Sequence, residues 1–235
     1  MLPQPDDVTC GPTCLHAVYR YYDDELPLAQ VIAETPMLTG GGTLAVHLGR
    51  HALGRGYRAK IYTFNLQVFD PTWFASPRPD LAGKLAAQRD AKRSPKLRAV
   101  CDAYIDFLGR GGRIVFRDLS RALLRRHLLR GAPILTGLSA TYLYRSARER
   151  SVGPRVVYDD VRGTPSGHFV VLSGYDVEAR TVRVADPYLP NPVAGTHYYD
   201  VSMARLISAI HLGILTYDAN LLVLQPRADV EPDRR

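Results

Sequence analysis

The sequence of 235 residues is poor in cysteine and has no long apolar run. Three cysteines are too few, and an odd number, for a disulfide framework. No segment approaches the roughly 18 uninterrupted apolar residues that a membrane span requires. The first dozen residues carry Asp6 and Asp7 but no basic residue, unlike a signal peptide. We therefore expect a protein of the reducing cytoplasm that has no contact with a membrane.

Linkers and internal repeats are also missing from the sequence. With 46% hydrophobic residues, the chain can bury a substantial core without disulfides. We predict a single domain over residues 1–235. Residues 70–112, where prolines precede two helical stretches, look like a helical insertion, and 226–235 form a charged tail.

Positive charge is abundant but regional. The formal net charge is +7, and 26 of the 30 basic residues are arginine. Residues 78–130 alone carry a net charge of +9. Such a region is typical of surfaces that hold nucleic acid, an anionic peptide or an acidic partner, and equally of solvated helix faces. Because these helices lack interleaved aromatic residues, we do not expect nucleic acid as the partner.

Apolar periodicity and turn residues predict the elements of secondary structure. Thr43 and Asp118 are the expected N-caps of two of the helices. The predicted helices cover residues 12–22, 27–34, 44–53, 81–93, 96–109, 119–130 and 206–210. The predicted strands cover residues 57–65, 133–138 and 221–224.

A β-hairpin is predicted from the β-rich runs 167–176 and 181–187, which flank a polar turn. Its midpoint falls near residue 177. His168 and Asp186 stand nine residues on either side of that midpoint, so the hairpin would bring them to the same end of adjacent strands.

The residue types needed by a thiol nucleophile are all present. Cys10 would lie at the start of a helix, where the positive end of the helix dipole favours a thiolate, and Gly11 would let a substrate carbonyl approach. The Asp186 carboxylate could orient the His168 imidazole toward Cys10. Gln4 and the backbone N–H of Cys10 are candidate donors to an oxyanion.

Other polar residues have simpler interpretations. Cys14 is interpreted as a packing residue rather than a disulfide partner of Cys10, and Cys101 as part of the core. Together with the two N-terminal cysteines, His47 and His51 would supply four zinc ligands. Because their spacing is not that of a usual zinc site, we predict no metal and no cofactor. The tyrosine runs at 142–144 and 198–199 would either line a substrate cleft or reflect the general preference of tyrosine for β-strands.

Four motifs together resemble one family of peptidases: Gln4, the segment Cys10-Gly-Pro-Thr-Cys-Leu15, the segment Gly167-His-Phe-Val-Val-Leu-Ser-Gly-Tyr175, and Ala185-Asp-Pro187. They resemble the bacteriocin-processing, double-glycine leader peptidases and their stand-alone bacterial relatives. The resemblance covers residues 4–65 and 131–224. It implies an α+β, papain-like fold, in which an N-terminal helical lobe packs on a C-terminal antiparallel sheet.

The resemblance also implies the role of each site residue. Cys10 would be the nucleophile, His168 the general base and acid, Asp186 the orienting carboxylate and Gln4 the oxyanion donor. The chain contains neither the membrane segment nor the Gly-x-x-x-x-Gly-Lys-Ser/Thr phosphate loop of the transporter-linked members.

We therefore expect a thiol-dependent hydrolase that cleaves an amide bond of a peptide or protein. If the basic insertion borders the cleft, the substrate would be acidic. Two alternatives stay open. An amine in place of water would make the enzyme a transpeptidase or ligase, and a non-catalytic binding protein would use the basic region 78–130.

Overall fold

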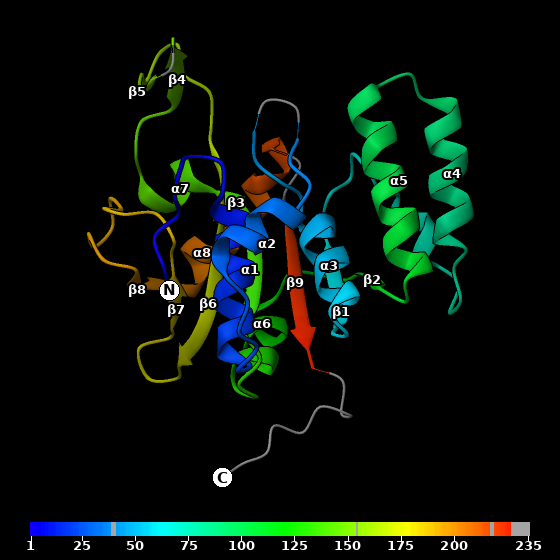
Figure 1. The fold of residues 1–235 in the computed structure, drawn as a ribbon, viewed down its shortest axis with the longest axis horizontal. Helices are drawn as coiled ribbons and strands as arrows, with labels where there is room; N and C mark the ends of the chain where they lie inside the picture. The colour runs from blue at the N-terminus through cyan, green and yellow to red at the C-terminus, as the bar shows by residue number, and fades with distance from the viewer. Residues whose placement is uncertain (39–40, 154, 217–218, 227–235) are drawn as a thin grey trace.

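A seven-stranded sheet forms the centre of the computed structural model, which describes residues 1–38, 41–153, 155–216 and 219–226 (Figure 1). The strand order is β2-β1-β9-β3-β6-β7-β8, and only the pair β1–β2 is parallel. The strands are β1 Arg58–Thr63, β2 Arg113–Phe116, β3 Ile134–Ser139, β6 Gly167–Asp176, β7 Thr181–Ala185, β8 Tyr198–Ser202 and β9 Asn220–Gln225. The predicted α+β class is confirmed. Two of the strands, β1 and β2, come from the first half of the chain.

Helices cover both faces of this sheet, so the molecule has two apolar cores. One face packs on α1 Cys10–Tyr21, α2 Leu28–Glu34 and α3 Ala45–Gly54, and the other on α6 Arg121–Leu128, α7 Ala140–Tyr144 and α8 Met203–Leu212. Alternate residues of a strand point to opposite faces. In β6, Phe169 and Val171 therefore join the first core, while Val170 and Leu172 join the second.

The helices predicted in residues 70–112 are present as α4 Leu81–Ala91 and α5 Pro95–Gly109, after a short 3-10 helix η1 Pro71–Phe74. The two helices stand beside α3 at one edge of the molecule (Figure 1). Asp80 and Ser94 cap them by accepting hydrogen bonds from Gly83 N and Leu97 N. That this segment is an insertion stays a prediction.

Two short elements flank the sheet. A separate hairpin of β4 Glu149–Val152 and β5 Arg155–Tyr158 projects from the molecule, and η2 Gly213–Thr216 follows α8 (Figure 1). Residues 227–235 of the predicted tail lie outside the described residues. Within the described ranges, no helix is both long and apolar enough to cross a membrane.

Both predicted N-caps are wrong. The hydroxyl of Thr43 donates to Pro36 O over 2.7 Å, so it holds the preceding loop, and α3 begins after Leu44. Asp118 lies too early in the chain, because Ser120 accepts the hydrogen bond from Leu123 N and caps α6. In each case the first turn starts one or two residues later than the polar side chain suggested.

Candidate active site

The β6–β7 hairpin brings His168 and Asp186 together, as the sequence predicts. His168 is the second residue of β6, and Asp186 directly follows β7. The two strands pair Val171 with Ala185, which leaves both side chains at the same end of the sheet. His168 Nε2 lies 2.8 Å from Asp186 Oδ1.

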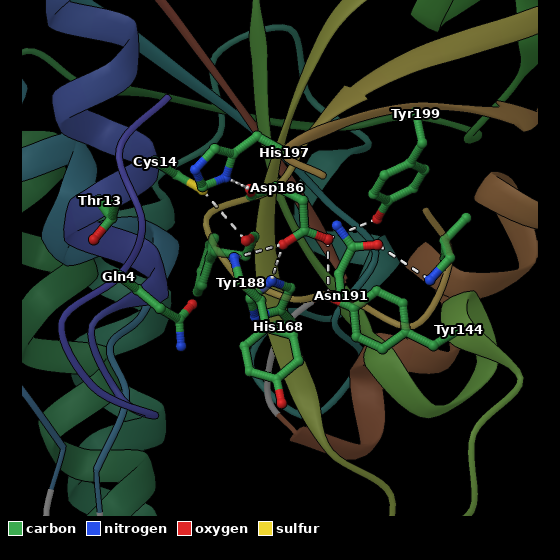
Figure 2. A network of polar contacts seen from close by, with 12 residues as sticks. Gln4, Thr13, Cys14, Tyr144, His168, Asp186, Tyr188, Asn191, His197 and Tyr199 are labelled. Carbon is green, nitrogen blue, oxygen red and sulfur yellow. Dashed lines mark hydrogen bonds and ion pairs between the residues drawn. The ribbon is translucent and has the colours of Figure 1, made fainter. Parts of the chain in front are cut away.

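Asp186 is fully buried and accepts four hydrogen bonds (Figure 2). Oδ1 accepts from the His168 ring and, over 2.9 Å, from Tyr188 N. Oδ2 accepts from the hydroxyls of Tyr144 and Tyr199 over 2.8 and 2.6 Å. Burial alone would raise the pKa of Asp186, but the charge of His168 and the hydrogen bonds from His168, Tyr199 and Tyr188 lower it. The site therefore holds an ionised carboxylate in the protein interior.

The electrostatics of His168 follow from this carboxylate. Burial by itself would lower the pKa of the imidazole, but Asp186, and after it Cys10, raise the pKa to about 10. Cys10 contributes through a side-chain hydrogen bond to the ring. Because Nε2 faces Asp186, the other ring nitrogen, Nδ1, is the one left for the thiol. His168 thus lies between a sulfur and a carboxylate.

Cys10 is the first residue of α1, so the helix begins two residues earlier than predicted. Its N-cap, Thr9, makes no side-chain hydrogen bond to the helix, and the first-turn N–H groups have no partner within the helix. Cys10 is 8% exposed. The adjacent Gly11 is required by packing, because a Cβ there would come within 2.5 Å of Thr43 Cγ2. That Gly11 also gives access to a substrate carbonyl stays a prediction.

Gln4 lies beside the site, on the side of α1 (Figure 2). Its backbone N–H donates to Pro187 O over 2.9 Å, which ties the N-terminal segment to the residue after Asp186. Its side-chain Nε2 donates to Asp6 O over 2.8 Å, and its Oε1 is buried without a partner. An amide nitrogen carries two hydrogens, so one N–H remains for another acceptor.

The cysteines outside the proposed nucleophile are buried, as predicted. Cys14 donates from Sγ to Phe169 O over 3.2 Å. Burial, together with Cys10 and Asp186, raises the pKa of the Cys14 thiol well above its ordinary value. Cys101 lies fully buried in the first core.

The zinc alternative has no support in the described part of the chain, where no three metal-ligating side chains gather. His51 instead uses both ring nitrogens. Its Nδ1 is 2.7 Å from the Tyr19 hydroxyl, and its Nε2 is 3.0 Å from Glu34 Oε2. Neither ring nitrogen is left to bind a metal.

Tyr144 and Tyr199 contact the candidate site through Asp186, which the sequence did not predict. Both belong to tyrosine runs that were noted as cleft or strand residues. In the structure, burial and the Asp186 carboxylate raise the pKa of both phenols, so both remain donors. The runs were visible in the sequence, but their acceptor lies 42 and 13 residues away.

A pocket of about 510 Å³ opens at the same end of the sheet. Ser139, which pairs with Gly167 just before His168, is one of its lining residues. The remaining wall includes the apolar residues Pro165, Leu212 and Leu215 and the cations Arg145 and Arg148.

Comparisons with known proteins agree with this fold. A family model described as "Peptidase_C39 like family" matches residues 99–208, a range that contains His168 and Asp186. Among solved structures, a putative C39-like peptidase from Bacillus anthracis is 13% identical, with a TM-score of 0.52, over 97% of this chain and 94% of that chain. No curated protein matches.

Two further structures have lower TM-scores. A double glycine motif protease from an AMS/PCAT transporter, in complex with the leader peptide, is 14% identical, with a TM-score of 0.45, over 97% of this chain and 91% of that chain. Xylellain, a cysteine protease from Xylella fastidiosa, is 15% identical, with a TM-score of 0.40, over 95% of this chain and 84% of that chain.

The fold is therefore similar to that of a C39-like peptidase. The resemblance to the C39 peptidase family, which the sequence motifs indicated, is confirmed.

Proposed function

We propose that this protein is a cysteine peptidase whose nucleophile is Cys10. The observation that carries the proposal is the position of the His168 ring, with the Cys10 thiol on one side and the buried Asp186 carboxylate on the other. A ring held in this way exchanges a proton with sulfur while its charge stays balanced by the carboxylate.

The reaction would be acyl transfer from an amide to water. The Cys10 thiolate attacks the amide carbonyl, and the tetrahedral oxyanion accepts hydrogen bonds from the Cys10 N–H and the second N–H of Gln4. The His168 imidazolium then protonates the leaving amine as the C–N bond breaks. Water, deprotonated by His168, attacks the thioester and releases the acid and the thiol.

Asp186, Tyr144 and Tyr199 would act through His168. With Oδ2 held by two phenols, the carboxylate has one fixed orientation, in which Oδ1 meets the imidazole. We therefore propose both tyrosines as positioning residues.

The substrate would be a peptide or protein, with an apolar side chain in the pocket beside Ser139. Leu215→Lys would then raise KM for peptides with an apolar side chain near the cleaved bond and leave iodoacetamide labelling of Cys10 unchanged. An unaltered KM would remove the pocket from the proposal.

An acidic substrate stays a prediction. Arg125 lies over the ring of Tyr175, near the end of β6 opposite to His168. This arginine therefore lies far from the proposed cleft and gives the prediction no support.

Mass-spectrometric mapping of iodoacetamide labelling near pH 6.5 tests the proposal. We expect preferential labelling of Cys10 in the wild type and much weaker labelling in His168→Ala. His127→Ala, which removes another buried histidine outside the site, is the matched control and should label like the wild type.

Equal labelling of the three cysteines, or labelling that ignores His168→Ala, would show that Cys10 is not an activated nucleophile. That result would favour the alternative of a non-catalytic binding protein. If Cys10 is activated, a product assay with an added amine distinguishes a hydrolase from a transpeptidase.

A further inference from the structure

Helix α6 covers only part of one face of strand β1. His127 of α6 packs its ring against Tyr62 and lies 3.1 Å from the Tyr62 hydroxyl. Arg58 and Lys60 precede Tyr62 at every second position, so they lie on the same face of the sheet. Beyond the helix, this face opens into a pocket of about 540 Å³ that also includes Arg113 among its lining residues.

The sheet fixes the spacing of these cations. Lys60 of β1 pairs with Arg113 of the parallel strand β2, and Arg58 pairs with Gln225 of β9. Neighbouring strands lie about 4.8 Å apart, and alternate residues of one strand about 6.8 Å apart. Three cationic side chains and one amide therefore start from a rigid backbone within a few ångströms of one another.

No carboxylate of the described residues forms an ion pair with Arg58, Lys60 or Arg113, nor with three further arginines nearby, Arg117, Arg126 and Arg130. Burial, with Arg113, Arg126 and Arg117, lowers the pKa of Lys60. Burial, with Arg126, Lys60 and Arg130, lowers the pKa of His127 to about 4. The charges that act on this pocket are therefore all positive.

Several arginines elsewhere in the chain are paired with carboxylates. Arg89 bonds to Asp90 and Asp102, and Arg183 bonds to Asp200. Like charges held close together repel one another, and a bound anion would offset that repulsion. The gathering of Arg58, Lys60 and Arg113 in one pocket, with no carboxylate partner among the described residues, thus points to an anionic ligand.

We infer that this basic pocket binds a small polyanion with clustered oxygen charges, such as a phosphate ester or an inorganic polyphosphate. Guanidinium and ammonium groups are the usual partners of phosphate oxygens. The pocket volume is in the range of small-molecule sites, and its lining contains no Phe, Tyr or Trp on which bases would stack.

The pocket is separate from the proposed active site. Gln225 ends β9, whereas Asn220 begins it and pairs with Gly137 near the end of the sheet that carries His168. Five residues of strand span about 17 Å. Binding in the pocket therefore does not depend on peptidase activity.

Isothermal titration of the full-length protein with tripolyphosphate, in 50 and 200 mM salt, tests the inference. We expect saturable binding that weakens with salt. In Lys60→Gln/Arg113→Gln the affinity should fall about tenfold or more, since two charge-assisted contacts are lost. The control Arg93→Gln/Arg98→Gln removes the same charge from exposed positions and should change the affinity by less than about twofold.

Adenosine triphosphate in a parallel titration separates the two sources of phosphate. Tighter binding than that of tripolyphosphate indicates a phosphate ester, and equal binding indicates recognition of the polyphosphate alone. Circular dichroism melting of both double variants verifies that they are folded.

Three results would overturn the inference: no saturable binding, equal weakening in both double variants, or binding of only duplex DNA or polyglutamate. A chain that ends at Pro226 adds a fourth comparison, because residues 227–235 contain Asp229, Glu231 and Asp233. If tripolyphosphate binds only to that shortened chain, the pocket serves the chain's own tail and not a small polyanion.

Discussion

The Asp186 carboxylate and the cations of the basic pocket belong to the same sheet, but their charges have opposite surroundings. The Asp186 carboxylate is fully buried, and four donors occupy its two oxygens. Arg58, Lys60 and Arg113 line an open pocket and have no carboxylate partner among the described residues. A group whose partners are all internal is held in one orientation. A cation without a carboxylate partner is available to an anion outside the chain.

The largest expected effect comes from removing the buried charge. Asp186→Ala would leave two buried phenols and His168 without their acceptor. We expect it to cost about 3–5 kcal/mol in the free energy of unfolding and to abolish selective labelling of Cys10. Urea unfolding measures the first effect and mass spectrometry the second.

Asp200→Ala is the matched control, because it removes an exposed carboxylate that pairs with Arg183. It should cost no more than about 1 kcal/mol. If both variants lose a similar free energy of unfolding, the buried, hydrogen-bonded carboxylate does not stabilise the fold more than the exposed one.

A smaller effect is expected from Tyr199→Phe, which removes one donor from Asp186. We expect kcat to fall about tenfold with little change in KM, because the substrate does not contact this phenol. The control is Tyr22→Phe, because the Tyr22 hydroxyl donates to Leu224 O and not to Asp186. This variant should leave kcat unchanged.

The pH dependence of Tyr199→Phe has a definite sign. The pKa of Asp186 is depressed in the folded protein, so the stability that this carboxylate contributes is present above its ordinary pKa. It is lost as the pH falls through the lower, folded value. Without the Tyr199 hydrogen bond the folded pKa rises, and the acid limbs of activity and stability should both move to higher pH. If the acid limb of activity in Tyr199→Phe stays at the wild-type pH, Tyr199 is not a positioning residue.

The smallest effect concerns the pocket. Lys60→Gln/Arg113→Gln removes like charges that repel one another, so the free energy of unfolding should rise by a few tenths of a kcal/mol at low salt. Arg183→Gln, which breaks an exposed ion pair, should instead lower it slightly. Melting curves at 20 and 500 mM salt measure the stability change in both variants. High salt should remove the increase in stability of Lys60→Gln/Arg113→Gln.

The sequence predicted the elements and pairings that depend on local pattern. Periodicity predicted the first helix, although from residue 12 and not from Cys10, and a short polar turn predicted the hairpin that joins His168 to Asp186. The caps at Thr43 and Asp118 were wrong because a hydroxyl or carboxylate near a helix start has several acceptors and donors to choose from.

Contacts across long separations could not be predicted. The basic region was assigned to residues 78–130, yet its pocket is completed by Arg58 and Lys60, which the strand pairing of β1 with β2 brings to Arg113. Tyr144 reaches Asp186 only because α7 follows β3 on the face of the sheet where α8 also packs.

By itself, the sequence determined which chemical groups this protein possesses, where most of its longer helices form, and that Cys10, His168 and Asp186 stand at element ends. Those properties depend on residue type and on neighbours a few positions away. The tertiary structure alone decided which charges have partners. Pairing depends on distances across the sheet, so the same fold encloses Asp186 among its donors and leaves Lys60 among other cations.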